Sequence, residues 1–270
     1  MKIYIGLILI LALLLCGCRK DNGLTDFRAE IDHFYGRKVF LDSEGYACWQ
    51  TNDIVNINGQ NYPIVVDDHG GATISGVPIS NHGYRAIYAF SASANAQGYS
   101  IVTLPHTQVY RENVIQMPMV AYADNNDSPL LFRHMCSLMR VTVSGVGSIS
   151  SIQVSASVPL SGNGMVQGTD ESPVLVLDND QPNEVELDCG NIQISGQRDF
   201  YIIIPPVSDP GNKFTITVNG RCIASDGTWS TSFSRTQPAG DIYQVSNQIT
   251  LGISEESALN NLQSITLQLV

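Results

Sequence analysis

Short apolar runs separated by polar turn residues make up the chain from Phe27 onward. Each run is about four to eight residues long, the usual length of a strand in a folded β-protein. Turn pairs such as Asn58-Gly59 and Asn219-Gly220 stand between the runs and favour tight reversals of the backbone. This pattern predicts an all-β fold. The clearest strand candidates are residues 53–57, 64–66, 86–91, 100–104, 138–143, 149–156, 174–177, 184–189, 200–204 and 214–218.

Helical periodicity is almost absent from the chain. Only residues 255–262 have a short helical look, and no internal repeat is visible. The length of 270 residues allows one large β-sandwich or two modest ones. Gly, Asn, Gln and Thr cluster in residues 162–173, where the apolar pattern lapses. A domain boundary is best placed there, with one domain over residues 27–168 and a second over residues 169–270.

The first residues have the pattern of a processing signal. A lysine at the second position precedes an apolar segment, residues 3–15, that is too short to cross a hydrocarbon core of ~30 Å as a helix. The small residue Gly17 stands directly before Cys18, as in the cleavage site of a bacterial lipoprotein precursor. We therefore predict a lipoprotein signal peptide over residues 1–17, a lipid on Cys18 and a tether over residues 18–26. An ordinary secretory signal is the alternative.

Charge and composition narrow the range of partners. The formal net charge is −11, and removal of the signal peptide with its single lysine makes the mature chain more negative. That sign argues against binding of nucleic acid and against electrostatic docking on a membrane. Charged residues make up only 14% of the chain, and this low share together with 23 glycines is typical of an exported β-protein.

Four cysteines follow the predicted lipid site. An even number in an oxidising compartment allows two disulfides. However, no Cys-x-x-Cys is present, and each cysteine lies in or beside an apolar run, where a free thiol acts as a small buried hydrophobe. Disulfides and free thiols both remain open for Cys48, Cys136, Cys189 and Cys222.

The residues that usually bind metals or carry catalysis are scattered along the sequence. A zinc site at His134 and Cys136 would need two further ligands that no spacing indicates. The acidic stretches 124–127 and 178–180 could offer oxygen ligands to calcium, but they are typical first of hydrophilic turns. No G-x-S-x-G, P-loop or H-E-x-x-H motif is present. We therefore expect no metal, no cofactor and no enzymatic activity.

One segment resembles a known family. Residues 130–143 read LLFRHMCSLMRVTV, similar to the L-x-F-x-H-x-x-S-x-L-x-V-x-V strand of fimbrillin-like lipoproteins, the subunits of type V pili. Residues 49–55 resemble the W-x-x-G-D-x-I opening of that family, with Asn52 where Gly is usual. Further segments that resemble the family in the same order are residues 84–90, 101–105 with Gln108, 117–121, 200–206 and 233–245.

The resemblance implies two transthyretin-like β-sandwich domains in tandem, without catalytic residues. In such pilins an arginine-directed protease removes the N-terminal segment with the first strand, and a strand of another subunit fills the groove. Arg28 and Arg37 fall in the window that the resemblance marks for this processing. Otherwise, both are ordinary surface arginines.

A candidate donor strand lies in the tail, residues 263–270. Ile265, Leu267 and Leu269 alternate there with polar residues, which is the two-residue period of a strand. The tail could insert into another subunit, or it could be the last strand of the second sandwich.

The sequence thus favours a lipidated component of an adhesive pilus at the bacterial outer membrane, as subunit, tip or anchor. Its expected partners are other pilus subunits and the outer membrane, reached through the lipid on Cys18. The alternative is a standalone surface lipoprotein that binds a glycan or a host protein through loops, for which the Gly-rich residues 67–83 and residues 93–99 are candidates. An outer-membrane hydrolase is a weaker third possibility.

Overall fold

The chain folds into strands alone wherever its structure is described. The computed structural model describes residues 23–32, 49–89, 92–94, 100–112, 115–207, 212–222, 225–234 and 262–269. Every regular element in these ranges is a β-strand, and the strands form several sheets, so the predicted all-β class is confirmed. Within the same ranges, no helix is long and apolar enough to span a membrane.

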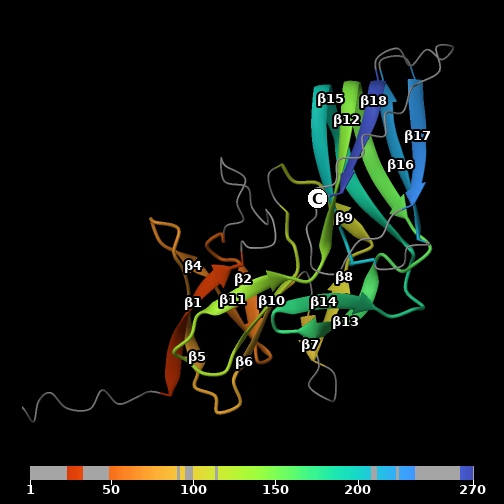
Figure 1. The fold of residues 1–270 in the computed structure, drawn as a ribbon. Helices are drawn as coiled ribbons and strands as arrows, with labels where there is room; N and C mark the ends of the chain where they lie inside the picture. The colour runs from red at the N-terminus through yellow and green to blue at the C-terminus, as the bar shows by residue number, and fades with distance from the viewer. Residues whose placement is uncertain are drawn as a thin grey trace, which may run out of the picture.

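An eight-stranded sheet forms one face of the lower part of the molecule in Figure 1. The strands run in the order β3-β2-β6-β10-β11-β1-β5-β4, so the first strand lies inside the sheet rather than at an edge. The strands are β1 (Leu24–Ile31), β2 (Ile54–Ile57), β3 (Gln60–Pro63), β4 (Val65–Val66), β5 (Ala72–Pro78), β6 (Tyr84–Tyr88), β10 (Met119–Ala123) and β11 (Leu130–His134).

A four-stranded sheet lies next to the first sheet and shares a core with it. Its order is β14-β13-β8-β7. Buried residues of both sheets, such as Val55 and Ile74 in the first and Leu104 and Leu175 in the second, belong to one hydrophobic cluster. Together these two sheets therefore form a sandwich around the first core. The strands of the smaller sheet are β7 (Ala92–Ala94), β8 (Ser100–Leu104), β13 (Gly162–Thr169) and β14 (Ser172–Leu177).

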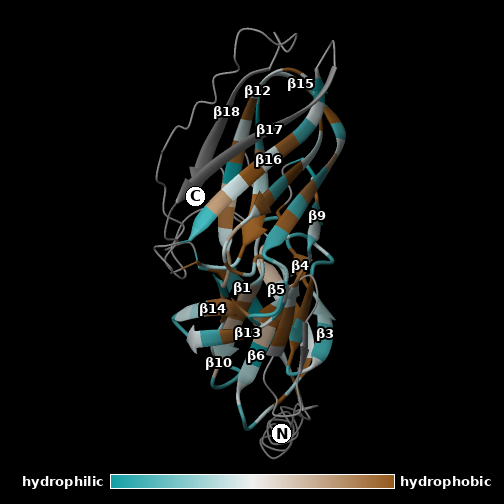
Figure 2. Cartoon of the chain, turned by 90° about the vertical axis from the view of Figure 1, so that its right-hand side faces the viewer, coloured by the Kyte–Doolittle hydropathy of each residue, from teal (hydrophilic) through white to brown (hydrophobic). Residues whose placement is uncertain are grey.

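A third sheet forms the upper part of the molecule in Figure 1. Its order is β17-β16-β12-β15-β9, and β18 also pairs with β12. Hydrophilic and hydrophobic residues alternate along β16, as Figure 2 shows, because one face of the strand covers a core. The strands are β9 (Thr107–Val109), β12 (Ser137–Ser155), β15 (Glu184–Ile204), β16 (Lys213–Cys222), β17 (Ser225–Ser234) and β18 (Leu262–Leu269).

The long ribbon of β12 and β15 bends near its middle. Gly145 pairs there with Gly196, and their φ angles of 144° and 101° lie where residues with side chains are rarely found. Val141 precedes the bend and Val154 follows it, yet both belong to the second hydrophobic cluster. The ribbon therefore folds over, and its two halves enclose the same core.

The two cores alternate along the chain. Leu138 and Ile203, which pair with each other, belong to the first cluster, whereas Met139 and Ile202 belong to the second. The chain returns to the first core at Leu175. The boundary that we predicted between residues 168 and 169 falls at the end of β13, one strand of the β13–β14 hairpin, which packs on the first core.

Two segments differ from the sequence-based expectation. Residues 162–173, where the apolar pattern lapses and no strand was expected, form β13 and the start of β14. Their glycines interrupt the apolar pattern, but one of them is needed for close packing, since a Cβ on Gly164 would lie 2.4 Å from the carbonyl oxygen of Val176. β1 starts at Leu24, inside the segment that we assigned to a tether.

Candidate functional site

The first strand is a central part of the first core. β1 runs parallel to β11 on one side and antiparallel to β5 on the other. Phe27, Ala29 and Ile31 point inward and are at most 6% exposed. Arg28 and Glu30 point outward, and the Arg28 Nε lies 3.0 Å from the Glu30 Oε1. Loss of β1 would therefore open a groove between β11 and β5 with three vacated side-chain positions.

The end of β1 is fastened by an ion pair. The Arg133 Nε lies 2.8 Å from the Oδ2 of Asp32, and both side chains are largely buried. The Arg133 Nη1 donates a second hydrogen bond, of 2.7 Å, to the carbonyl oxygen of Asp170 in the β13–β14 turn. The Asp32 N–H donates to the carbonyl oxygen of Phe132. Arg133 thus joins the first strand to the smaller sheet of the same sandwich. We call this set of contacts the Arg133 clasp.

Of the two predicted processing residues, the structure describes only Arg28. Arg28 lies in the middle of β1, where its backbone pairs with Thr73 of β5. Arg37 and Cys18 lie outside the described residues. Processing and lipidation at these residues stay predictions.

The predicted donor residues lie in β18, which pairs antiparallel with β12 of the same chain. Ile265 is opposite Val143, and Leu269 is opposite Met139. From Met139 to Gly145, β12 pairs with β15 on one side and with β18 on the other. In the free chain the tail is therefore a strand of its own upper sheet, as one of the two alternatives expects. Donation to another subunit stays a prediction.

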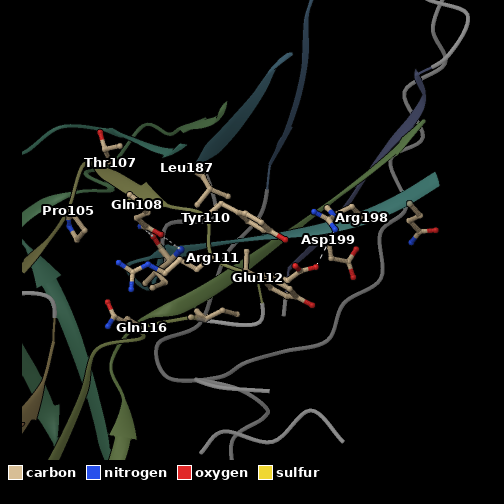
Figure 3. A pocket seen from close by; sticks show the side chains of 15 residues that line it. Pro105, Thr107, Gln108, Tyr110, Arg111, Glu112, Gln116, Leu187, Arg198 and Asp199 are labelled. Carbon is tan, nitrogen blue, oxygen red and sulfur yellow. Dashed lines mark hydrogen bonds and ion pairs between the residues drawn. The ribbon is translucent and has the colours of Figure 1, made fainter. Parts of the chain in front are cut away.

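A cavity of about 530 Å³ lies between β9 and the second half of β15, two strands of the upper sheet (Figure 3). One wall is formed by Pro105, β9, residues 110–112, Ile115 and Gln116. The opposite wall is formed by β15 from Gln197 to Ile203. Leu187, on the first half of β15, joins the two walls because this strand folds back on itself. The volume lies within the range of small-molecule sites in proteins.

The Gln108 side chain ties the two walls of this cavity together. Its Nε2 donates a hydrogen bond of 2.8 Å to the carbonyl oxygen of Ile203, and its Oε1 accepts one of 2.9 Å from the Ile203 N–H. Gln108 is only 6% exposed, so these bonds are shielded from water. They hold the cavity open in a fixed shape.

Polar and aromatic side chains line the remainder of the cavity. The Arg198 Nη2 lies 3.2 Å from the Glu112 Oε1, which pairs two of the lining charges. The Tyr110 ring packs on Phe200 with their centroids 5.2 Å apart. Burial is the main cause that raises the pKa of Tyr110, so its hydroxyl is protonated at neutral pH and can donate a hydrogen bond.

Sequence analysis did not identify this cavity. Gln108 and Tyr201 were noted only as parts of family-like segments, and Tyr110 and Gln197 carry no motif. Their proximity depends on the fold of β15, which a pattern of apolar residues does not reveal.

Among the described residues, no group of three or more His, Cys, Asp or Glu side chains is placed to hold a metal ion. The Asn125 Oδ1 accepts a hydrogen bond of 3.0 Å from the Asp127 N–H, which is the arrangement of a turn. The His106 Nε2 lies 3.2 Å from the Glu184 Oε1, in a partly exposed pair.

Two of the cysteines are buried free thiols. Cys136 and Cys189 have no disulfide partner. Burial raises the pKa of both thiols, that of Cys189 to about 12. Cys48 and the side chain of Cys222 lie outside the described residues.

Trp49 is a core residue and is 8% exposed. Its ring makes edge contacts with Phe132 and Tyr88, at centroid distances of 4.9 Å and 5.3 Å. Burial is the largest effect on the neighbouring Asp53, whose pKa is raised. The Asp53 Oδ1 accepts a hydrogen bond from the Tyr88 hydroxyl at 3.3 Å. These contacts fasten β2 to β6 and suggest no separate chemistry.

Comparison with known sequences gives a match at the C-terminal end of the chain. Residues 226–270 match the family described as ATP:guanido phosphotransferase, C-terminal catalytic domain, and this family model is not one of fimbrillins. A protein-arginine kinase of Desulforamulus reducens is 54% identical over 35 residues, which are 13% of this chain and 10% of that protein. The protein-arginine kinase of Moorella thermoacetica is 59% identical over 34 residues, which are 13% of this chain and 10% of that protein.

These matches correct the expectation that the chain has no enzymatic character. They point to a kinase, although the chain spans about a tenth of the length of these relatives. The expectation rested on the absence of short catalytic motifs. A match to part of a catalytic domain requires none of them. Within the matched residues 226–270, the structure describes the backbone of β17 and β18.

Comparison with solved structures gives a match over almost the whole chain. The crystal structure of a putative cell adhesion protein from Bacteroides ovatus is similar with a TM-score of 0.50. The match covers 90% of this chain and 95% of the other, at 13% sequence identity. At this identity the likeness establishes the fold, and the chain has the fold of that Bacteroides ovatus protein.

Proposed function

We propose that this chain is a surface adhesion protein that assembles by strand replacement, as a component of a type V pilus at the bacterial outer membrane. The observation that carries the proposal is the position of β1 inside the eight-stranded sheet, directly before the segment that contains Arg37. Support for an adhesive role comes from the fold shared with a protein described as a cell adhesion protein. The predicted lipid on Cys18 would deliver the chain to the outer membrane.

Removal of β1 would leave an unstable surface that favours a replacement strand. Each large apolar side chain withdrawn from the core forfeits about 1.5–3 kcal/mol of burial. The facing edges of β11 and β5 would also lose their backbone partners, which leaves unpaired N–H and C=O groups. Another strand with an apolar residue at every second position restores both the apolar burial and the backbone hydrogen bonds.

The tail of another copy has the required pattern. The apolar residues of β18 recur at the same two-residue spacing as those that β1 buries. In the free chain, pairing with β12 keeps this tail in its own sheet. Donation therefore requires β18 to exchange its partner within the chain for a groove in the next subunit. The kinase-like residues 226–270 include this tail, so in this proposal they contain the segment exchanged between subunits.

Of the two candidate processing residues, Arg37 suits this proposal better. A protease that cleaved after Arg28 would have to bind a backbone already paired with β5. Cleavage after Arg37 would release the whole of β1 together with Asp32, which breaks the Arg133 clasp.

The proposal is tested by treating the purified chain with an arginine-specific protease. We expect a new N-terminus after Arg37 and ladders that resist SDS on gels. Deletion of residues 263–270 and the Arg37→Ala substitution should each abolish the ladders. The Arg28→Ala variant is the matched control and should still form them. A chain that is cleaved efficiently after Arg37 and stays monomeric would show that the proposal is wrong.

A further inference from the structure

The cavity beside β9 contains an open strand edge, which the proposed assembly does not use. Both backbone groups of Ile203 bond to Gln108, so they point away from β12. N–H and C=O groups point to the same side at every second residue of a strand. Those of Gln197, Asp199 and Tyr201 therefore face the same side as those of Ile203, and all three residues line the cavity.

No described strand pairs with this part of β15. β9 pairs with β15 only at Glu186, Leu187 and Asp188, on the first half of the strand. β12 occupies the opposite side of the second half. The edge from Gln197 to Tyr201 therefore offers alternating donors and acceptors to whatever enters the cavity.

The side chains that line the cavity include two cations, Arg111 and Arg198, and two anions, Glu112 and Asp199. Arg198 pairs with Glu112. The Asp199 Oδ1 accepts a hydrogen bond of 2.5 Å from the Thr142 hydroxyl, and its Oδ2 lies 3.8 Å from the Arg140 Nη1. The cavity therefore has no excess of one sign that would select a strongly charged ligand.

We infer that this cavity binds one sugar unit of a carbohydrate. A sugar hydroxyl both donates and accepts hydrogen bonds, and the open edge supplies acceptors and donors side by side. The amides of Gln116 and Gln197 offer both as well. The rings of Tyr110 and Tyr201 supply apolar surface for the C–H face of the sugar. The cavity is thus mixed in polarity and nearly neutral, as a polyhydroxylated ligand requires.

This site is built from residues other than those of the β1 groove. Its function does not depend on strand replacement, because none of its lining residues belongs to β1, β5 or β11. A monomer that never assembles should bind the sugar as well as an assembled subunit.

The experiment is saturation-transfer NMR on the full chain, with free glucose, galactose, mannose and N-acetylglucosamine as probes. Titration then gives the dissociation constant of the sugar that binds. Gln197→Ala removes an exposed amide at the cavity, and Gln193→Ala removes an exposed amide from the same strand outside it. We expect Gln197→Ala to raise the dissociation constant about tenfold, the usual effect of one lost hydrogen bond to a ligand, and Gln193→Ala to leave it unchanged.

Each outcome bears on the inference. Binding that is weakened by Gln197→Ala alone supports it, and a similar loss in Gln116→Ala confirms that both walls contact the sugar. Absence of saturation transfer with all four sugars at millimolar concentration overturns it. Equal binding by the Gln197→Ala and Gln193→Ala variants also overturns it. A short acetylated peptide of alternating Val and Thr serves as a competitor probe, and a cavity that takes this peptide but none of the sugars would be a strand-binding site instead.

Discussion

Phe27 and Arg28 are neighbours in sequence and face opposite sides of the same sheet. The Phe27 ring is 1% exposed and lies 4.6 Å, centroid to centroid, from the ring of Tyr84. The Arg28 side chain is 74% exposed and forms an ion pair with Glu30. Substitutions at the two positions therefore distinguish what the core and the surface of one strand contribute to the free energy of unfolding.

Substitution of Phe27 by Ala should lower the free energy of unfolding by about 3–5 kcal/mol, since it leaves a cavity in the first core. Arg28→Ala should change it by less than about 1 kcal/mol, because an exposed ion pair contributes little. Urea unfolding of the two variants measures the difference. Equal losses in both variants would mean that β1 is not part of the folded core.

The buried thiols provide a second prediction at the level of single residues. Only the thiolate reacts with iodoacetamide, and burial raises the pKa of Cys189 to about 12. Since the thiolate forms only as the pH approaches that value, the folded chain should hold this thiol unreactive at pH 8. Cys136 is more deeply buried and should behave in the same way.

Mass spectrometry of the digested protein measures the extent of labelling by iodoacetamide at each cysteine. We expect the peptides with Cys136 and Cys189 to stay unlabelled in the native chain and to be fully labelled after denaturation in urea. Rapid labelling of Cys189 in the folded chain would contradict its burial. The measurement also reports the state of Cys48 and Cys222.

Among the elements, the β12–β15 ribbon depends on a pair of glycines. A Cβ on Gly196 would meet no other atom within 4 Å, so a substitution there introduces no clash. What remains is the backbone, whose φ of 101° is unfavourable for any residue with a side chain. Gly196→Ala should therefore destabilise the chain by about 1–2 kcal/mol.

The neighbouring residue supplies the control for this prediction. Ser195 is exposed and is not among the positive-φ residues, and Ser195→Ala should alter the free energy of unfolding by less than about 0.5 kcal/mol. Thermal unfolding by circular dichroism compares the two variants. If both unfold at the same temperature, the bend does not require glycine.

The strands show where a pattern of apolar residues is sufficient. β8 lies at residues 100–104, as expected, because its apolar run is bounded by turn residues on both sides. The runs 138–143 and 149–156 were expected as two strands and form the single β12, since the small residues between them are paired by β15. β13 was missed because its partners in β8 and β14, and not its own side chains, place it in a sheet.

Of the candidate functional segments, the sequence predicted the donor strand β18, but it did not predict β1 or the cavity. Alternation alone identified the apolar residues of β18, since a strand that covers a core has a period of two. β1 was not among the expected strands, because its first residues fall in the segment 18–26 that we assigned to a tether. The sugar cavity needs residues near positions 108, 187 and 199 to meet. Such long-range contacts are set by how β15 bends.

For the whole molecule, the alternation of the chain between two cores determines how it unfolds. Residues 139–160 contribute to the second core, residues 175–177 return to the first, and residues 185–202 belong to the second again. β9 directly follows β8, so the chain passes there from the lower sandwich to the upper sheet. The hydrogen bond from Gln108 to Ile203 then fastens β9 to β15. Neither core can be completed by an uninterrupted length of chain.

We therefore expect both cores to unfold in one cooperative transition. Phe27→Ala weakens the first core, and Phe214→Ala, at a fully buried position, weakens the second. Hydrogen exchange of the backbone amides, read separately in β8 and β16, distinguishes the possibilities because these strands cover different cores. Each variant should accelerate the slowest exchange in both strands by a similar factor, since global unfolding exposes both. If Phe27→Ala accelerated exchange in β8 and left β16 unchanged, while Phe214→Ala did the reverse, the two cores would unfold independently.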